Sequence, residues 1–169
     1  MCALEWNKMT KKELYARIDS ILSFQFTPTF AKLFLEKFEH MNFEFSPRTG
    51  KIRYIKEGNE LLASYISKNG TFSIMLNTVL KLYRRIPTPK NRVKILSSVS
   101  EFIENGKSVF AKHVVDVDPN LLVGDQVFVV DQQDKLLAVG KLEAPPHYLK
   151  MLNSGVAVSV KKGIAKLKQ

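Results

Sequence analysis

The heptapeptide Gly-Lys-Ser-Val-Phe-Ala-Lys occupies residues 106–112. Residues 97–105 before it favour a short helix, and Gly106 suits the C-cap of that helix because glycine adopts a left-handed conformation without steric cost. The β-branched and aromatic residues that follow favour a strand over residues 108–115. The heptapeptide therefore predicts a change from helix to strand in the second half of the chain.

Short apolar stretches separated by turn residues continue from there. A small helix is expected at residues 148–152. Strands this short with turns this frequent are typical of a small closed barrel. The pattern predicts one such domain over residues 91–169. Its expected strands lie at residues 92–96, 108–115, 126–130, 136–142, 156–160 and 164–167.

The first 90 residues have a different pattern. Thr10 and Glu13 match a capping box ahead of a helix over residues 9–22, and Thr27-Pro28-Thr29 favours the start of a second helix. From Phe43 the apolar period shifts toward two, which predicts strands up to Ser67; residues 71–76 suit either a strand or the start of a helix. A helix over residues 77–85 follows. Residues 1–90 are thus expected to form a small α+β domain, so the fold class is α+β.

Charge points to a polyanionic partner. The chain of 169 residues has a formal net charge of +10 and a pI near 9.7. The excess is +8 in residues 1–92 and only +2 in residues 93–169. A basic imbalance of this size favours nucleic acid first and an anionic membrane surface second.

Several classes of function lack support in the sequence. Cys2 is the only cysteine, so an intramolecular disulfide is impossible. The N-terminal residues have no signal-peptide pattern and no apolar run could cross a bilayer, which predicts a cytoplasmic location and no membrane partner. His40, His113 and His147 lack the spacing of metal ligands. No phosphate loop or nucleophile elbow is present, so we expect no metal, no cofactor and no catalysis.

Several ordered blocks resemble a known family. Residues 106–112, residues 118–130, Leu136–Gly140 and Gly155–Val158 resemble a PUA domain. The blocks Arg48–Arg53 and Asn91–Lys94 are similar to the domain that precedes PUA in the archaeal tRNA-guanine transglycosylases that start archaeosine synthesis. The resemblance covers roughly residues 43–163. It implies a pre-PUA-like domain followed by a PUA-type pseudo-barrel of short mixed β-strands.

The same resemblance implies an RNA-binding surface. In PUA domains the loop after the first helix, the next strand and the last strand contact the RNA backbone. A glycine lets a phosphate approach and its N–H can donate, while lysines neutralise phosphates. Phe110 suits core packing as well as base stacking, and the last two lysines suit simple solubility as well as contact. The implied residues are Gly106, Lys107, Ser108, Phe110, Lys112, Lys161 and Lys162.

The first domain adds further candidates. Arg48, Lys51 and Arg53 cluster around an expected turn. Arg92 lies at the junction of the two domains, where it suits either a phosphate contact or a bond between the domains. These residues complete the expected RNA-binding set.

Three hypotheses for function remain open. The first is a non-catalytic protein that binds structured tRNA, in its acceptor region, in connection with tRNA modification. The second is an accessory subunit of a split archaeosine transglycosylase or a related tRNA-modifying enzyme, with a separate catalytic chain as partner. The third is a ribosome-biogenesis factor that binds rRNA.

Overall fold

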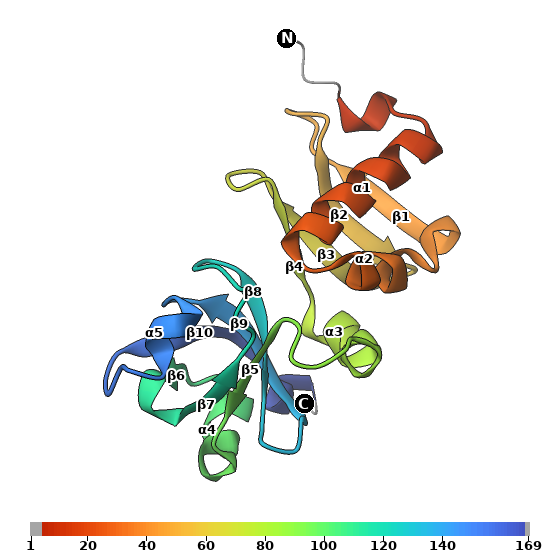
Figure 1. Cartoon of the computed structure of the whole chain (residues 1–169). Helices are drawn as coiled ribbons and strands as arrows, with labels where there is room; N and C mark the ends of the chain where they lie inside the picture. The colour runs from red at the N-terminus through yellow and green to blue at the C-terminus, as the bar shows by residue number, and fades with distance from the viewer. Residues whose placement is uncertain (1–4, 168–169) are drawn as a thin grey trace. The chain divides into compact units, whose positions relative to one another are not determined.

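A computed structural model of the chain describes residues 5–167 (Figure 1). These residues fall into two compact units, of which the first ends at Ile86 and the second begins at Pro87. Each unit has its own sheet. Cys2, on which the expectation about disulfides depends, lies outside the described residues.

Helices open the first unit. The short 3-10 helix η1 (Trp6–Lys8) precedes α1 (Lys11–Gln25) and α2 (Pro28–Leu35). The Glu13 N–H donates to the Thr10 hydroxyl, and the Glu13 carboxylate accepts from the Thr10 N–H at 2.8 Å, which confirms the capping box. Helix α2 begins with a proline at its first position, behind the cap of Thr27.

An antiparallel sheet forms the rest of this unit. Its strands are β1 (Met41–Phe45), β2 (Ile52–Glu57), β3 (Glu60–Ile66) and β4 (Thr71–Ile74), in the spatial order β1-β2-β3-β4. Helix α1 crosses one face of the sheet (Figure 1). The buried side chains of the two layers form the core. After η2 (Phe38–His40) and the sheet, α3 (Leu76–Leu82) and η3 (Tyr83–Arg85) close the unit, so the segment 71–76 is mainly strand.

The second unit contains a mixed six-stranded sheet. Its strands are β5 (Arg92–Ile95), β6 (Val109–Phe110), β7 (Val114–Val117), β8 (Gln126–Val130), β9 (Leu136–Leu142) and β10 (Val156–Gly163). Their order is β6-β10-β9-β8-β5-β7, and only the β5–β8 pair is parallel. Helices η4 (Ser97–Val99), α4 (Ser100–Glu104) and α5 (Pro146–Leu149) connect the strands. Every residue of β8 is buried, as expected for the inner strand of a small barrel. The expected α+β fold class with a pseudo-barrel is confirmed.

Two expected strands differ in the structure. The strand expected over residues 108–115 is divided by η5 (Ala111–His113), because its first part pairs with β10 and its second part with β5. The chain needs a helical turn to pass from one edge of the sheet to the other. Residues 164–167 form the 3-10 helix η6 rather than a strand. Strand β10 instead continues to Gly163 and so includes both lysines 161 and 162.

Candidate nucleic-acid interface

The loop after α4 is a helix-capping motif. Gly106 has φ +92°, and its N–H donates to the Ile103 carbonyl at 2.9 Å. The Lys107 N–H donates to the Phe102 carbonyl at 3.0 Å, which completes a Schellman motif. The expectation that the Gly106 N–H is available to a phosphate is therefore wrong. The glycine serves the turn, and the side chain of Lys107 is the exposed cation that the turn presents.

The end of β10 lies against this cap. A Cβ on Gly163 would lie only 2.0 Å from the Glu104 carbonyl oxygen, so the strand passes directly beside the end of α4. A Cβ on Gly106 would lie 4.0 Å from Cε of Lys166, which brings that lysine to the same place. Lys166 was missed because sequence spacing does not connect it with residue 106.

Lys161 and Lys162 are exposed on β10. The pairing of β10 with β9 slips between Val160 and Lys162, so Lys161 is the extra residue of a bulge. A bulge redirects side chains at a sheet edge. Lys107, Lys161, Lys162 and Lys166 are therefore gathered around one end of β10.

Phe110 and Lys112 lie at the other end of that strand. Phe110 pairs with Val156, at the start of β10, and its side chain is 47% exposed. The ring is thus not part of the buried core. The Ala111 N–H donates to the Gly155 carbonyl at 2.9 Å and fixes the segment. Ser108 is half-buried between the two groups.

An open depression of about 340 Å³ adjoins Phe110. Its lining supplies an aromatic face, a cation, an imidazole, an amide and a hydroxyl. Such groups can stack on a planar base, neutralise a phosphate and bond base edges. The lining residues are Phe110, Lys112, His113, Asn153, Ser154 and Gly155.

The expected residues of the second unit thus form two groups rather than one. About six residues of extended strand separate Val156 from Lys162, which corresponds to roughly 20 Å. One group is the depression beside Phe110, and the other is the lysine cluster beside Gly106. We call them the aromatic depression and the cap lysines (Lys107, Lys161, Lys162 and Lys166).

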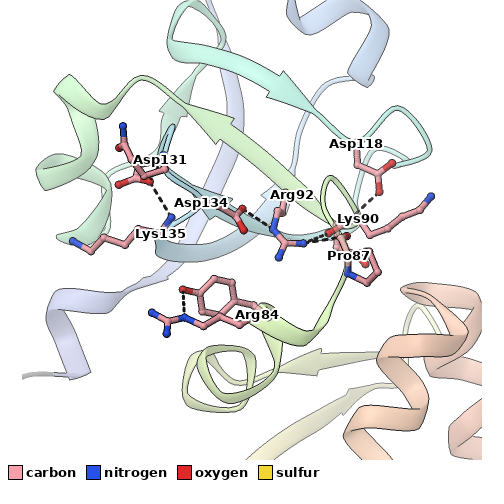
Figure 2. Close-up of polar contacts among 11 residues, drawn as sticks. Arg84, Pro87, Lys90, Arg92, Asp118, Asp131, Asp134 and Lys135 are labelled. Atoms are coloured by element: carbon pink, nitrogen blue, oxygen red, sulfur yellow. Dashed lines mark hydrogen bonds and ion pairs between the residues drawn. The ribbon is translucent and has the colours of Figure 1, made fainter.

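Arg92 is not available as a surface cation. Its side chain is 3% exposed, and its Nε lies 2.8 Å from Oδ1 of Asp134. Its Nη1 also donates to the Lys90 carbonyl at 3.0 Å. Figure 2 shows the guanidinium directed at Asp134 and at the main chain between Pro87 and Lys90. This arrangement holds the start of β5 in place, so we leave Arg92 out of the RNA-binding surface.

The neighbouring loops are held by carboxylates in similar ways. Asp118 is buried and accepts from the Asn91 N–H at 2.9 Å. Asp125 accepts from the Leu122 N–H at 2.8 Å, as expected for a turn with a side-chain bond. Burial raises the pKa of Asp125; the Leu122 hydrogen bond opposes this rise and the charge of Asp118 adds to it. These carboxylates stabilise the loops and are not part of the candidate RNA-binding surface.

Arg48 and Lys51 of the first unit lie in the turn between β1 and β2, and Arg53 lies just inside β2. Arg48 and Arg53 are exposed, and Lys51 is half-buried. The Arg53 guanidinium lies 5.1 Å from the centre of the Tyr54 ring, a cation–π contact. The turn and the start of β2 therefore carry the three expected cations together.

Two kinds of feature are absent from residues 5–167. No group of three His, Cys, Asp or Glu side chains there has the geometry of a metal site. No helix in the same range is long and apolar enough to span a bilayer.

Comparison with known families identifies both units. Residues 91–164 match the PUA domain, and residues 16–89 match the patch-forming domain C2 of tRNA-guanine transglycosylase. The second unit is thus similar to PUA domains, and most of the first is similar to that C2 domain. More particularly, the chain joins these two units as the C-terminal part of tRNA-guanine transglycosylases does, which confirms the resemblance seen in the sequence.

The curated relatives are much longer. The tRNA-guanine(15) transglycosylase of Thermococcus onnurineus is 31% identical over 94% of this chain and 27% of the relative. That of Methanothermobacter thermautotrophicus is 34% identical over 74% of this chain and 19% of the relative. The chain thus spans about a quarter or less of these relatives, and the matched part is not their catalytic domain.

Solved structures agree on the fold. A hypothetical protein from Pyrococcus horikoshii superposes with a TM-score of 0.66 at 22% identity, covering 95% of this chain and 98% of that one. A conserved PUA domain protein from Thermoplasma acidophilum gives 0.59 at 19% identity, covering 92% and 91%. Both therefore have the same succession of an α+β unit and a barrel.

Proposed function

We propose that this chain is a non-catalytic RNA-binding protein that docks structured tRNA, at its acceptor region, in the service of tRNA modification. The aromatic depression is the observation that carries the proposal. Phe110 presents nearly half of its surface to solvent beside Lys112, although a barrel core lies directly behind it. An exposed ring next to a cation is suited to an unpaired base and its phosphate.

The acceptor region matches the two groups of the second unit. It combines a base-paired stem with an unpaired 3′ end. A-form RNA hides its major groove, so a stem is recognised by phosphates and 2′-hydroxyls, whereas unpaired bases can be stacked. We assign the stem to the cap lysines and the unpaired end to the aromatic depression. Both lie in the unit that matches the PUA domain.

Similarity to the transglycosylases supports a role for this chain together with a tRNA-modifying enzyme. Because the relatives are named for a tRNA-modifying activity, we propose a catalytic tRNA-modifying chain as partner and the cytoplasm as location. Co-purification from native cells tests the partner: a transglycosylase in the complex supports the proposal, and a chain isolated without such an enzyme contradicts it.

The binding experiment uses two tRNA transcripts, one intact and one without its unpaired 3′ nucleotides. Filter binding is measured at salt concentrations from about 0.05 to 0.2 M. We expect the intact transcript to bind, and its affinity to fall steeply with salt. Its affinity should exceed that of the shortened transcript by roughly 5- to 150-fold, the contribution of a stacked base. Absence of tRNA binding at the lowest salt would overturn the function, and equal affinities would overturn the assignment of the 3′ end.

The remaining alternative is ribosomal RNA. Crosslinking in cells separates the two RNAs, because the chain is joined covalently to whatever it contacts. Reads that map mainly to tRNA support the proposal. Reads that map mainly to rRNA replace it with a role in ribosome assembly.

A further inference from the structure

An apolar pocket lies in the first unit between α2 and α3. It has a volume of about 210 Å³ and is partly open to solvent. The two helices contact each other beside it (Figure 1). Because Met41 begins β1 and Leu62 lies near the start of β3, the pocket is at the end of the sheet opposite to the β1–β2 turn. We call it the α2–α3 pocket, and its apolar lining is Leu33, Phe34, Met41, Leu62 and Leu82.

Three ion pairs surround the apolar lining. The guanidinium of Arg85 donates to both carboxylate oxygens of Glu36, at 2.7 and 2.8 Å, and so joins η3 to the end of α2. The hydroxyl of Thr78 donates to the Leu62 carbonyl at 3.1 Å. Every polar side chain that lines the pocket thus has a partner within the unit. The ion pairs are Glu36 with Arg85, Lys37 with Glu57 at 3.0 Å, and Lys81 with Glu60 at 2.6 Å.

This balanced rim decides the charge of the occupant. Each cation at the pocket faces a carboxylate, so the fields of the two charges largely cancel at short range. A phosphate of RNA or of an anionic lipid would have to displace a glutamate before it met a free cation. The α2–α3 pocket is therefore suited to an uncharged, apolar group rather than to a polyanion.

The volume decides the size of the occupant. An apolar cavity of about 150 Å³ holds one benzene molecule. The 210 Å³ of this pocket therefore accommodates one leucine or one aromatic side chain. Small-molecule sites are larger, roughly 300–1,000 Å³, and present polar groups that orient the ligand. A single apolar side chain in a pocket with a polar rim is instead the arrangement at the centre of protein–protein interfaces.

We propose that the α2–α3 pocket is the docking site for the separate catalytic tRNA-modifying chain, which inserts one leucine or aromatic side chain into it. The inference rests on the proposed function, in which such a chain is the partner. The part matched by this chain is only 27% of the Thermococcus onnurineus relative. A catalytic chain encoded separately needs a non-covalent contact where the relative has a continuous polypeptide.

The position of the pocket allows RNA and this partner to bind together. The aromatic depression and the cap lysines lie in the second unit, and Arg48, Lys51 and Arg53 lie near the other end of the first unit's sheet. None of these residues lines the α2–α3 pocket. A partner held there consequently leaves the candidate RNA-binding residues uncovered.

The test compares two variants of the full chain that carry the same change on the same helix. Leu82→Glu places a carboxylate in the pocket wall. Leu80→Glu is the matched control, because Leu80 is 40% exposed on α3 and does not line the pocket. Each tagged chain is added to an RNase-treated extract of native cells, and the captured tRNA-guanine transglycosylase is quantified by mass spectrometry. We expect Leu82→Glu to capture at least about tenfold less than wild type, and the control to stay within about twofold.

A second variant fills the pocket without adding charge. Leu33→Trp supplies an aromatic side chain from the chain's own α2, in the volume that the partner's side chain would occupy. We expect the same loss of capture, with a thermal midpoint equal to or above that of wild type, because additional apolar surface is buried. This combination cannot arise from misfolding. If Leu33→Trp captures the enzyme as wild type does, the pocket is not the docking site.

The outcomes separate this inference from the proposed function. If every variant captures the enzyme equally, the inference fails and the proposed partner stands. If the wild type captures none, both fail, while filter binding of tRNA tests the RNA-binding function independently. If Leu82→Glu weakens tRNA binding more than Leu80→Glu does, the pocket belongs to the RNA surface instead. A dimer of the chain alone that Leu82→Glu dissociates, seen by size-exclusion chromatography, would assign the pocket to a second copy and overturn the inference.

Discussion

At the scale of single residues, burial decides which basic and aromatic side chains can meet a ligand. Arg92 and Phe110 show both directions of this effect. The arginine is almost fully buried against Asp134 and main-chain carbonyls, whereas the phenylalanine is open to solvent. From hydropathy alone, the arginine would be expected at the surface and the phenylalanine in the core. The exposed ring is the unusual observation, and it marks the candidate site.

Replacement of the exposed ring tests that site. Phe110→Ala should weaken binding of the intact tRNA transcript by roughly 5- to 150-fold, because a stacked base contributes about 1–3 kcal/mol. Its free energy of unfolding should fall by less than about 1 kcal/mol, since the ring is half exposed. Phe102→Ala is the matched control, because Phe102 is 62% exposed on α4 and outside the depression. Equal affinities of the two variants would contradict the assignment.

A second residue gives a pH dependence of stability. Burial raises the pKa of Asp125, so the folded chain keeps this proton at pH values where the unfolded chain has lost it. Stability from this group therefore falls as the pH rises from near the ordinary Asp value of 3.8 through the folded pKa. Asp125→Asn keeps an acceptor for the Leu122 N–H without the charge.

Urea unfolding of wild type and Asp125→Asn at about pH 4 and pH 7 measures this effect. The variant should gain stability relative to wild type at the higher pH, where wild-type Asp125 is ionised. A difference in unfolding free energy that is constant between the two pH values would show that the carboxyl is not perturbed in this way.

At the scale of elements, the contact between α4 and the end of β10 brings together segments that are distant in sequence. The end of α4 carries a Schellman motif, and Gly163 passes directly against its carbonyls. A glycine is required there by the close approach itself, since any side chain would overlap Glu104. Because the cap lysines surround this contact, it also positions them.

Gly163→Ala should therefore destabilise the chain by about 3 kcal/mol, the upper range for a forced overlap in a packed region. Gly124→Ala is the control, because Gly124 has φ +95° but open space around its Cα. Its cost should be only about 1–2 kcal/mol, from backbone strain alone. Chemical unfolding measures both, and equal losses would show that backbone freedom rather than packing explains Gly163.

At the scale of the whole molecule, two compact units carry the proposed RNA contacts separately. The first supplies Arg48, Lys51 and Arg53 around its β1–β2 turn, and the second supplies the aromatic depression and the cap lysines. Most of the chain's excess charge belongs to the first unit, while the exposed aromatic ring belongs to the second. We therefore assign the long-range attraction of RNA to the first unit and the positioning of the bound RNA to the second.

Because the proposed contacts lie in separate units, variants in the two units should lower the free energy of tRNA binding additively. Arg48→Gln/Lys51→Gln and Lys107→Gln/Lys112→Gln affect residues without shared partners, so their free-energy losses in tRNA binding should add within about 0.5 kcal/mol in the quadruple variant. In affinity, the fold losses multiply. A quadruple variant no weaker than the weaker of the two doubles would indicate that the surfaces do not engage one RNA together.

Local sequence signals determined much of the fold. The capping box of Thr10 and Glu13, the proline that starts α2 and the alternating strands act within a few residues, so they are readable before folding. The blocks at residues 106–112 and 118–130 likewise identified the barrel. Gly106 as a helix cap belongs to this class.

Only the tertiary structure decided which of the basic residues are available. Arg92 is neutralised by Asp134, 42 positions away in sequence, and Lys37 and Lys81 are neutralised by glutamates about 20 positions away. Lys166 joins the cap lysines because η6 packs near the end of α4, 60 positions from Gly106. The physical reason is that charge compensation and burial depend on which segments pack together, whereas helix caps and strand alternation depend on the neighbours along the chain.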